Sequence, residues 1–226
     1  MAPLTLRIPI LGGRLRRKKW DFASGGKVLR VLLGSYEREQ TALFERLIKP
    51  AGVVLDIGAH VGYYTLLSAD LAGPSGRVFA FEPEPKNAAF LKKHVQMNAC
   101  ANVTVVEAAV GDKNGTAYFD YGTGTGTGHL AQNGKLAVPV LTLDTFCAER
   151  SLTPTHLKID VEGAEMLVFQ GGRETIERAR PVIFLSTHGP EIHNKCLAFL
   201  QTLNYKFEAM IGDDPQTATE VLCLPG

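Results

Sequence analysis

The stretch that most constrains how this chain of 226 residues can fold is residues 53–65, VVLDIGAHVGYYT. It opens with an apolar, β-rich run, which is typical of a strand buried on both faces of a parallel sheet. Gly58 and Gly62 then permit a tight turn and a close approach of the backbone to a ligand. Residues 64–72 follow as a predicted helix, whose first turn offers unpaired N–H groups to an anionic group. The stretch therefore predicts a strand, a glycine turn and a helix, with a ligand at the turn.

The rest of the chain repeats this alternation of strand and helix. Further core strands are predicted at 76–82, 103–110, 155–162 and 181–187, and helices at 36–49, 85–98, 144–149, 164–178 and 191–203. Residues 205–211 and 220–224 are expected to close the sheet as an antiparallel hairpin. This order predicts an α/β fold built on an open, doubly wound, mostly parallel sheet.

Three segments outside that pattern carry expectations of their own. Residues 116–121 are predicted as a short extra strand, and 136–143 as an edge strand because Pro139 lacks a backbone donor. The Gly/Thr-rich loop 122–129 is expected to be mobile and to gate a substrate site, the alternative being a plain surface loop. We expect an N-terminal arm over residues 1–35 and a single domain over 36–226.

Charge and cysteine usage restrict the kinds of partner and the cellular compartment that the sequence favours. The net charge of +1 argues against a nucleic-acid partner, and the basic run at 14–19 is predicted to be a solvated part of the arm rather than an anion-attracting one. The four cysteines are scattered without a C-x-x-C pair, as expected in a reducing compartment. No apolar run has transmembrane length, and no signal peptide is recognisable. These features predict a cytoplasmic protein that does not enter a membrane.

An acidic residue stands at the tip of each of the first two predicted core strands, Asp56 and Glu82. A carboxylate at the second tip is suited to accept the hydroxyl protons of a ribose. The alternative is a pair of solvated strand-end acids, but two of them around a glycine turn favour a nucleoside site. The turn reads D-x-G-x-x-x-G and lacks the G-x-G-x-x-G fingerprint, which argues against a nicotinamide-dependent oxidoreductase.

Ionisable residues gather in the predicted strand 155–162. Lys158, Asp160 and Glu162 would share one of its faces, because side chains alternate along a strand. Charged groups inside a parallel sheet are costly unless they are paired or functional. A structural Lys158–Asp160 ion pair, with Glu162 and Glu165 stabilising the next helix, is the alternative to a catalytic role. We favour the functional interpretation, because ligands of such folds bind at the carboxyl end of the sheet.

Histidines are expected near the same edge of the sheet. His188 follows the next strand, where it either satisfies a loop carbonyl or takes a proton from a substrate. The set His188, Glu191 and His193 lacks the H-E-x-x-H spacing of a zinc site, so that no metal is predicted. His60 lies inside the glycine turn and is expected to shape the pocket rather than to react.

These segments together resemble the FkbM family of S-adenosylmethionine (SAM)-dependent methyltransferases. The resemblance spans residues 34–190 and is carried by G-S-Y-E at 34–37, L-D-I-G-A-H-V-G-Y-Y-T at 55–65, F-E-P at 81–83, A-V-G-D at 109–112, L-D at 143–144 and L-K-I-D-V-E-G-A-E at 157–165. It implies a seven-stranded Rossmann-like sheet, SAM as the cofactor, and O-methylation of a hydroxyl on a sugar or a secondary metabolite. The residues that it implies for the cofactor are Asp56, Gly58, His60, Gly62, Thr65, Glu82, Ala109 and Asp160.

The resemblance leaves the proton acceptor open. Family members frequently carry an acid near the end of the strand before His188, where this chain has Ser186. We predict His188 as the base, since its reference pKa of about 6.5 suits proton transfer near neutrality, with Asp160 as the alternative. Lys158 and Asp160 would then orient the hydroxyl, and Glu162 would support the cluster.

The expected partner is a small-molecule or glycan acceptor, and a homo-oligomer is possible. Two other functions stay open at this stage: the oxidoreductase, and a non-catalytic protein that senses SAM or a nucleoside.

Overall fold

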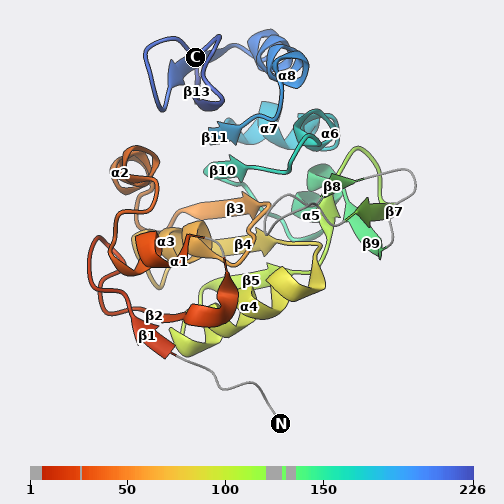
Figure 1. Ribbon diagram of the computed structural model, residues 1–226. Helices are drawn as coiled ribbons and strands as arrows, with labels where there is room; N and C mark the ends of the chain where they lie inside the picture. Colours follow the sequence, from red (N-terminus) through yellow and green to blue (C-terminus); the bar gives the residue numbers. More distant parts are fainter. Residues whose placement is uncertain (1–6, 26, 121–128, 131–135) are drawn as a thin grey trace.

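The computed structural model describes residues 7–25, 27–120, 129–130 and 136–226, and its centre is a seven-stranded sheet (Figure 1). In chain order its strands are β3 (Val53–Ile57), β4 (Arg77–Phe81), β5 (Val103–Val106), β10 (His156–Ile159), β11 (Val182–Ser186), β12 (Tyr205–Ala209) and β13 (Glu220–Pro225). The spatial order is β12-β13-β11-β10-β3-β4-β5, and β13 runs antiparallel to both of its neighbours. The predicted α/β fold with an antiparallel C-terminal hairpin is therefore confirmed.

Helices cover both faces of this sheet (Figure 1). One face carries α1 (Val28–Leu32), α2 (Arg38–Leu47), α3 (Tyr63–Ala72) and α4 (Pro85–Met97), and the other carries α5 (Leu143–Glu149), α6 (Glu165–Gln170), α7 (Arg173–Ala179) and α8 (Pro190–Thr202). Alternation along β3 explains both layers: Val54 packs with the first set, whereas Leu55 and Ile57 pack with the second. Strands buried on both faces need the continuous apolar runs that the sequence shows.

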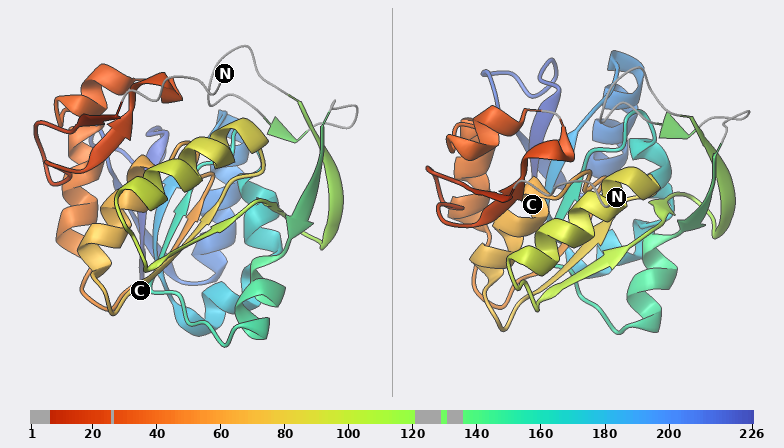
Figure 2. Two further views of the ribbon diagram at one scale, coloured as in Figure 1. Left: turned by 90° about the horizontal axis from the view of Figure 1, so that it is seen from below. Right: turned by 60° about the horizontal axis from the view of Figure 1, so that its bottom comes forward.

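The predicted third strand is divided between two sheets. β5 ends at Val106, whose carbonyl accepts a hydrogen bond from the Ala108 amide at 2.9 Å. The chain thereby turns, and β6 (Ala109–Val110) joins a four-stranded sheet of order β6-β9-β7-β8, with β7 (Gly115–Asp120), β8 (His129–Leu130) and β9 (Leu136–Leu141). Figure 2 shows this small sheet standing beside the main one. The predicted extra strand at 116–121 corresponds to β7.

The edge position predicted for the strand of Pro139 is wrong. β9 lies between β6 and β7, and Pro139 faces Thr116 of β7. On the other side, the pairing with β6 covers only Val140 and Leu141. Pro139 thus lies just beyond the end of that short ladder, so its missing N–H costs no hydrogen bond there.

The predicted helix 164–178 is interrupted. It forms α6 and α7, which meet at Gly171 and Gly172. A Cβ on Gly171 would lie 1.9 Å from the carbonyl oxygen of Gly111. This close approach of two backbones explains a glycine at a position where helix propensity alone would disfavour it.

The described part of the predicted N-terminal arm is folded onto the domain, although its basic run is largely exposed as predicted. It forms β1 (Arg7–Pro9), β2 (Lys19–Asp21), the 3-10 helix η1 (Phe22–Ser24) and α1. Trp20 is 1% exposed and its ring stacks on His94 with centroids 3.9 Å apart. The basic side chains do lie at the surface, where Arg14 pairs with Asp70 at 2.7 Å. The apolar residues between them are what bind the segment to the core.

The proposed gate at 122–129 lies, apart from its last residue, outside the described residues. Within the part of the chain that the structure describes, we find no helix long and apolar enough to cross a bilayer.

Candidate active site

A pocket of about 380 Å³ opens at the carboxyl ends of β3, β4, β10 and β11. Nine of the eleven sequence-predicted site residues contribute to its wall: Gly58, His60, Gly62, Glu82, Ala109, Lys158, Asp160, Glu162 and His188. The remaining predicted residues, Asp56 and Thr65, lie behind the wall. The fold therefore brings strand tips that are distant in the sequence to one cavity, as expected for an open parallel sheet.

The glycine turn after β3 is set by two close approaches. Gly58 has φ +81°, and a Cβ there would lie 1.8 Å from the carbonyl oxygen of Asp160. Gly62 has φ +95°, and its Cβ would lie 2.5 Å from Cδ1 of Leu91 in α4. Both positions combine a left-handed backbone with a lack of space, so only glycine fits them without strain.

Glu82 follows β4 and is 5% exposed. Its Oε2 accepts the backbone N–H of His60 at 2.7 Å, and its Oε1 accepts that of Glu84 at 3.0 Å. Burial raises the pKa of Glu82 to about 7, although these backbone hydrogen bonds oppose the rise. The Asn87 amide also donates to Oε1 at 3.5 Å, whereas Oε2 keeps a further lone pair for a hydroxyl donor.

Asp56 supports the site from behind. It is fully buried and accepts a hydrogen bond from the Thr65 hydroxyl at 2.5 Å. This bond ties the end of β3 to the first turn of α3 across the glycine turn. Asp56 Oδ1 also lies 3.7 Å from Lys158 Nζ, so the pair helps to hold the neighbouring strand end.

Lys158 is the buried cation of the site. Its ammonium donates to the Gly58 carbonyl at 2.8 Å and lies 3.3 Å from the Asp160 carboxylate. Burial alone would lower the pKa of Lys158, but the carboxylates of Asp160 and Asp56 outweigh it and raise the pKa. The ammonium is therefore charged near neutrality.

The prediction that Lys158, Asp160 and Glu162 share one strand face is wrong. β10 ends at Ile159, and Glu162 has φ +51°, which no strand residue adopts. The chain leaves the strand where the Asp160 carbonyl packs against Gly58. The three side chains nevertheless converge on the pocket, from a strand end and the loop that follows it.

His188 lies among three carboxylates. Its Nδ1 is 2.8 Å from Glu165 Oε1, and its Nε2 is 3.3 Å from Glu162 and 3.8 Å from Asp160. The hydrogen bond to Glu165, with help from the other two carboxylates, raises the pKa of His188 to about 9. The ring is therefore an imidazolium near neutral pH.

The same cluster offers donors for a cation. Asp160, Glu162 and His188 each present one ligand atom, and these atoms lie within 4.8 Å of one another. An imidazolium between carboxylates accounts for the same distances. The set weighed from the sequence does not converge, because His193 bonds Thr187 and Glu191 pairs with Lys195.

His60 lies in the turn between β3 and α3. Burial lowers the pKa of His60 to about 4, so its ring is neutral. Its Nε2 is buried and has no hydrogen-bond partner among the described residues.

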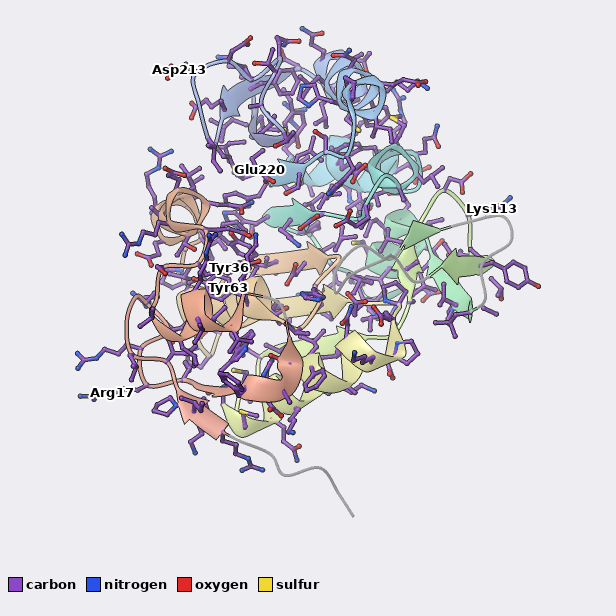
Figure 3. The ribbon with its side chains drawn as sticks, in the orientation of Figure 1. Arg17, Tyr36, Tyr63, Lys113, Asp213 and Glu220 are labelled. Atoms are coloured by element: carbon purple, nitrogen blue, oxygen red, sulfur yellow. The ribbon has the colours of Figure 1, made fainter. Side chains whose placement is uncertain are left out.

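Part of the wall was not predicted from the sequence. β2, the loop before α2 and α3 contribute aromatic side chains, and β13 contributes an acid: Trp20, Tyr36, Tyr63, Tyr64 and Glu220. Figure 3 labels Tyr36, Tyr63 and Glu220. The rings of Tyr36 and Tyr63 are 4.6 Å apart. The G-S-Y-E motif at 34–37 was the available signal for Tyr36, whereas nothing in the local pattern marked Trp20 or Glu220.

Comparison with known proteins identifies the family of this chain. The family described as "Methyltransferase FkbM domain" matches residues 56–207. The 2-O-methyltransferase NoeI of Sinorhizobium fredii is 31% identical in an alignment of 155 positions that covers 59% of this chain. The chain spans 63% of that relative's length.

Solved structures show the same fold. The methyltransferase FkbM from Methylobacillus flagellatus KT aligns with a TM-score of 0.56 at 15% identity, over 81% of this chain and 50% of that one. A candidate rRNA methylase from Clostridium thermocellum aligns with a TM-score of 0.54 at 16% identity, over 82% of this chain and 92% of that one. With the family match over most of the chain, the motifs and the sheet order lead to one conclusion: this protein belongs to the FkbM methyltransferase family.

Proposed function

We propose that this protein transfers the methyl group of SAM to a hydroxyl of a sugar or a related secondary metabolite. The observation that carries this is a single pocket that holds both Glu82 and the Lys158–Asp160 pair. The first suits a ribose, and the second suits a polar oxygen that must be oriented. The 2-O-methyltransferase relative supports a hydroxyl as the acceptor. The four free cysteines are in keeping with the proposed cytoplasmic location.

The residues of the turn fit a nucleoside cofactor. Glu82 Oε2 keeps a lone pair for a ribose hydroxyl after it accepts the His60 N–H, whereas Oε1 is shared by the Glu84 N–H and the Asn87 amide. His60 contributes a neutral ring to the same wall. When bound, SAM supplies the methyl group as an electrophile, and alignment and polarity are left to the protein.

The acceptor side of the pocket combines aromatic rings with charge. Tyr36 and Tyr63 offer ring faces to the apolar surface of an acceptor. Lys158, fixed by Asp160 and by the Gly58 carbonyl, presents its positive charge to an acceptor oxygen. This arrangement orients a hydroxyl and stabilises negative charge that develops on it.

We assign His188 a positioning role. The prediction that it is the base depended on a pKa near 6.5, and a pKa raised to about 9 keeps the ring protonated at neutral pH. An imidazolium cannot take up another proton. It can instead hold the carboxylates of Asp160 and Glu162 in place.

Two measurements test the function. Calorimetry with purified protein should show SAM binding, and methyl-labelled SAM should label members of a panel of methyl glycosides. Saturable SAM binding without label on any hydroxyl would favour the sensor. A nicotinamide cofactor bound in preference to SAM would contradict the proposal outright.

A further inference from the structure

Glu220 is a carboxylate of the pocket that the proposed mechanism has not yet used. It is half-buried at the start of β13 and faces Ser186 of β11 across the antiparallel ladder. The Ser186 hydroxyl donates to Glu220 Oε2 at 2.6 Å, and the Gln40 amide donates to the same oxygen at 3.1 Å. Both hydrogen bonds go to Oε2, and neither involves Oε1. The carboxylate is thus fixed in orientation with one oxygen left for a ligand.

The support around Glu220 is extensive. Gln40 lies in α2 and in turn accepts from the Tyr64 hydroxyl at 2.5 Å, while Tyr64 also contacts Glu37 at 2.8 Å. Glu37 belongs to the pocket wall and has φ +40°, a strained conformation for a side chain of this kind. A buried polar network that links two helices and two strands holds its members rigidly.

The other candidates for a base are already engaged. Asp160 lies between the Lys158 ammonium and the His188 ring, at 3.3 and 3.8 Å. His188 is itself protonated near neutrality. Burial raises the pKa of Glu220 to about 7, although the Ser186 hydrogen bond opposes the rise. The pKa of Glu82 is raised equally, but Glu82 is assigned to the ribose, so Glu220 is the remaining pocket carboxylate whose raised pKa suits proton transfer at neutral pH.

We propose that Glu220 accepts the proton of the methyl acceptor. Glu220 lies beside Ser186, the position at which related proteins frequently carry an acid, and supplies the carboxylate that Ser186 lacks. This inference rests on the proposed methyl transfer. The acceptor O–H bond breaks and its proton passes to Glu220 Oε1, while the oxygen forms a bond to the methyl carbon and the carbon–sulfur bond breaks with its electron pair kept on sulfur. Release of the proton from Glu220 to water then restores the carboxylate.

The first test is the isosteric variant Glu220→Gln, with Glu208→Gln as its control. Glu208 is an exposed acid of the neighbouring strand β12 and is outside the pocket wall. We expect Glu220→Gln to bind SAM with unchanged affinity and to lower turnover of the labelled methyl glycoside by about 10²–10⁴, the scale of general-base assistance. The control Glu208→Gln should keep the SAM affinity and the turnover of the wild type. A folded Glu220→Gln protein with wild-type turnover would overturn the inference.

A second variant keeps the carboxylate and moves only its pKa. Ser186→Ala removes a hydrogen bond that favours the ionised form, so the rising limb of the pH–rate profile should move to higher pH. Carboxyl NMR of Glu220, by difference from Glu220→Gln, should show the same movement without any turnover. An unchanged pH profile in Ser186→Ala would contradict the role of Glu220 even if Glu220→Gln failed to fold. Absence of methyl transfer by the wild-type protein would instead contradict the proposed function.

Discussion

Several side chains of the pocket titrate far from their ordinary range, and three of them carry the proposed roles. Burial raises the pKa of Glu82 and of Glu220 to about 7, and the hydrogen bond to Glu165 raises that of His188 to about 9. Groups with shifted pKa values concentrate at functional sites, because function needs charges in places where solvent would not keep them. Here the shifts separate the roles: two carboxyls that gain and lose protons near neutrality, and one ring that stays charged.

Replacement of Glu82 tests the cofactor site. Glu82→Ala should weaken SAM binding by about 1.5–3 kcal/mol, roughly 10- to 150-fold, because hydrogen bonds to a charged group are lost. Calorimetry measures this directly. Glu107→Ala, which removes a surface acid paired with Lys92, is the control and should leave the affinity unchanged. Equal SAM affinity in a folded Glu82→Ala protein would remove Glu82 from the ribose site.

The charge on His188 has a consequence for stability. Because its pKa rises from 6.5 to about 9 on folding, it stabilises the native state fully below pH 6.5. That contribution is lost as the pH rises from 6.5 through about 9. Urea unfolding should therefore show His188→Gln to be less stable than wild type at pH 6, with the difference shrinking towards pH 9. A stability difference between His188→Gln and wild type that does not change with pH would show that the ring acts only by packing.

At the scale of elements, the site depends on how strands end. β3 ends in a glycine turn, β4 in Glu82, β10 in a loop that carries Asp160 and Glu162, and β13 begins with Glu220. Side chains at these ends meet because parallel strands present their carboxyl ends at one edge, and an antiparallel strand presents its first residue there.

Two glycines separate backbone strain from close packing. Gly58→Ala must adopt φ +81° and also place a Cβ 1.8 Å from the Asp160 carbonyl oxygen, whereas Gly73 has φ +67° and nothing within 4 Å. Gly73→Ala should cost about 1–3 kcal/mol of unfolding free energy from strain alone. Gly58→Ala should cost about 2 kcal/mol more, because the β10 loop has to move. If Gly73→Ala and Gly58→Ala lost the same unfolding free energy in urea, the loop after β10 would move at no measurable cost in stability.

At the scale of the whole molecule, the N-terminal segment and the methyltransferase sheet form one core. Trp20 stacks on His94, whose Nδ1 donates to the Val61 carbonyl in the glycine turn at 2.7 Å while its Nε2 accepts from the Asp21 amide. Since burial lowers the pKa of His94, its neutral ring can serve one donor and one acceptor at once. The segment thereby reaches the cofactor turn through a single side chain.

Truncation of Trp20 tests this connection. Trp20→Ala should lower the free energy of unfolding by about 3–5 kcal/mol, as for large buried aromatic side chains, and should also weaken SAM binding. Trp20→Phe keeps a ring over His94, so it should lose less unfolding free energy and less SAM affinity than Trp20→Ala. Leu29→Ala removes an exposed side chain from the same segment and should change neither. A Trp20→Ala protein with the unfolding free energy of the wild type would show that the N-terminal segment does not contribute to the core.

The sequence by itself determined the order of the main strands and helices and the glycine turn and strand-tip acid that line the pocket. Apolar runs mark buried strands, glycines mark the turn, and a strand-tip acid such as Glu82 stands within a few residues of its strand, so local pattern was enough. The FkbM motifs named the family from the same short segments.

Only the tertiary structure decided the acceptor side. Gln40 and Glu220 are 180 residues apart in the chain, yet they share a hydrogen bond. The pKa of His188 depends on three carboxylates that the folded loops bring to it. Burial and charge interaction are properties of the assembled neighbourhood, and no local pattern encodes them. For the same reason the sequence pointed to His188 as the base, and the fold points to Glu220.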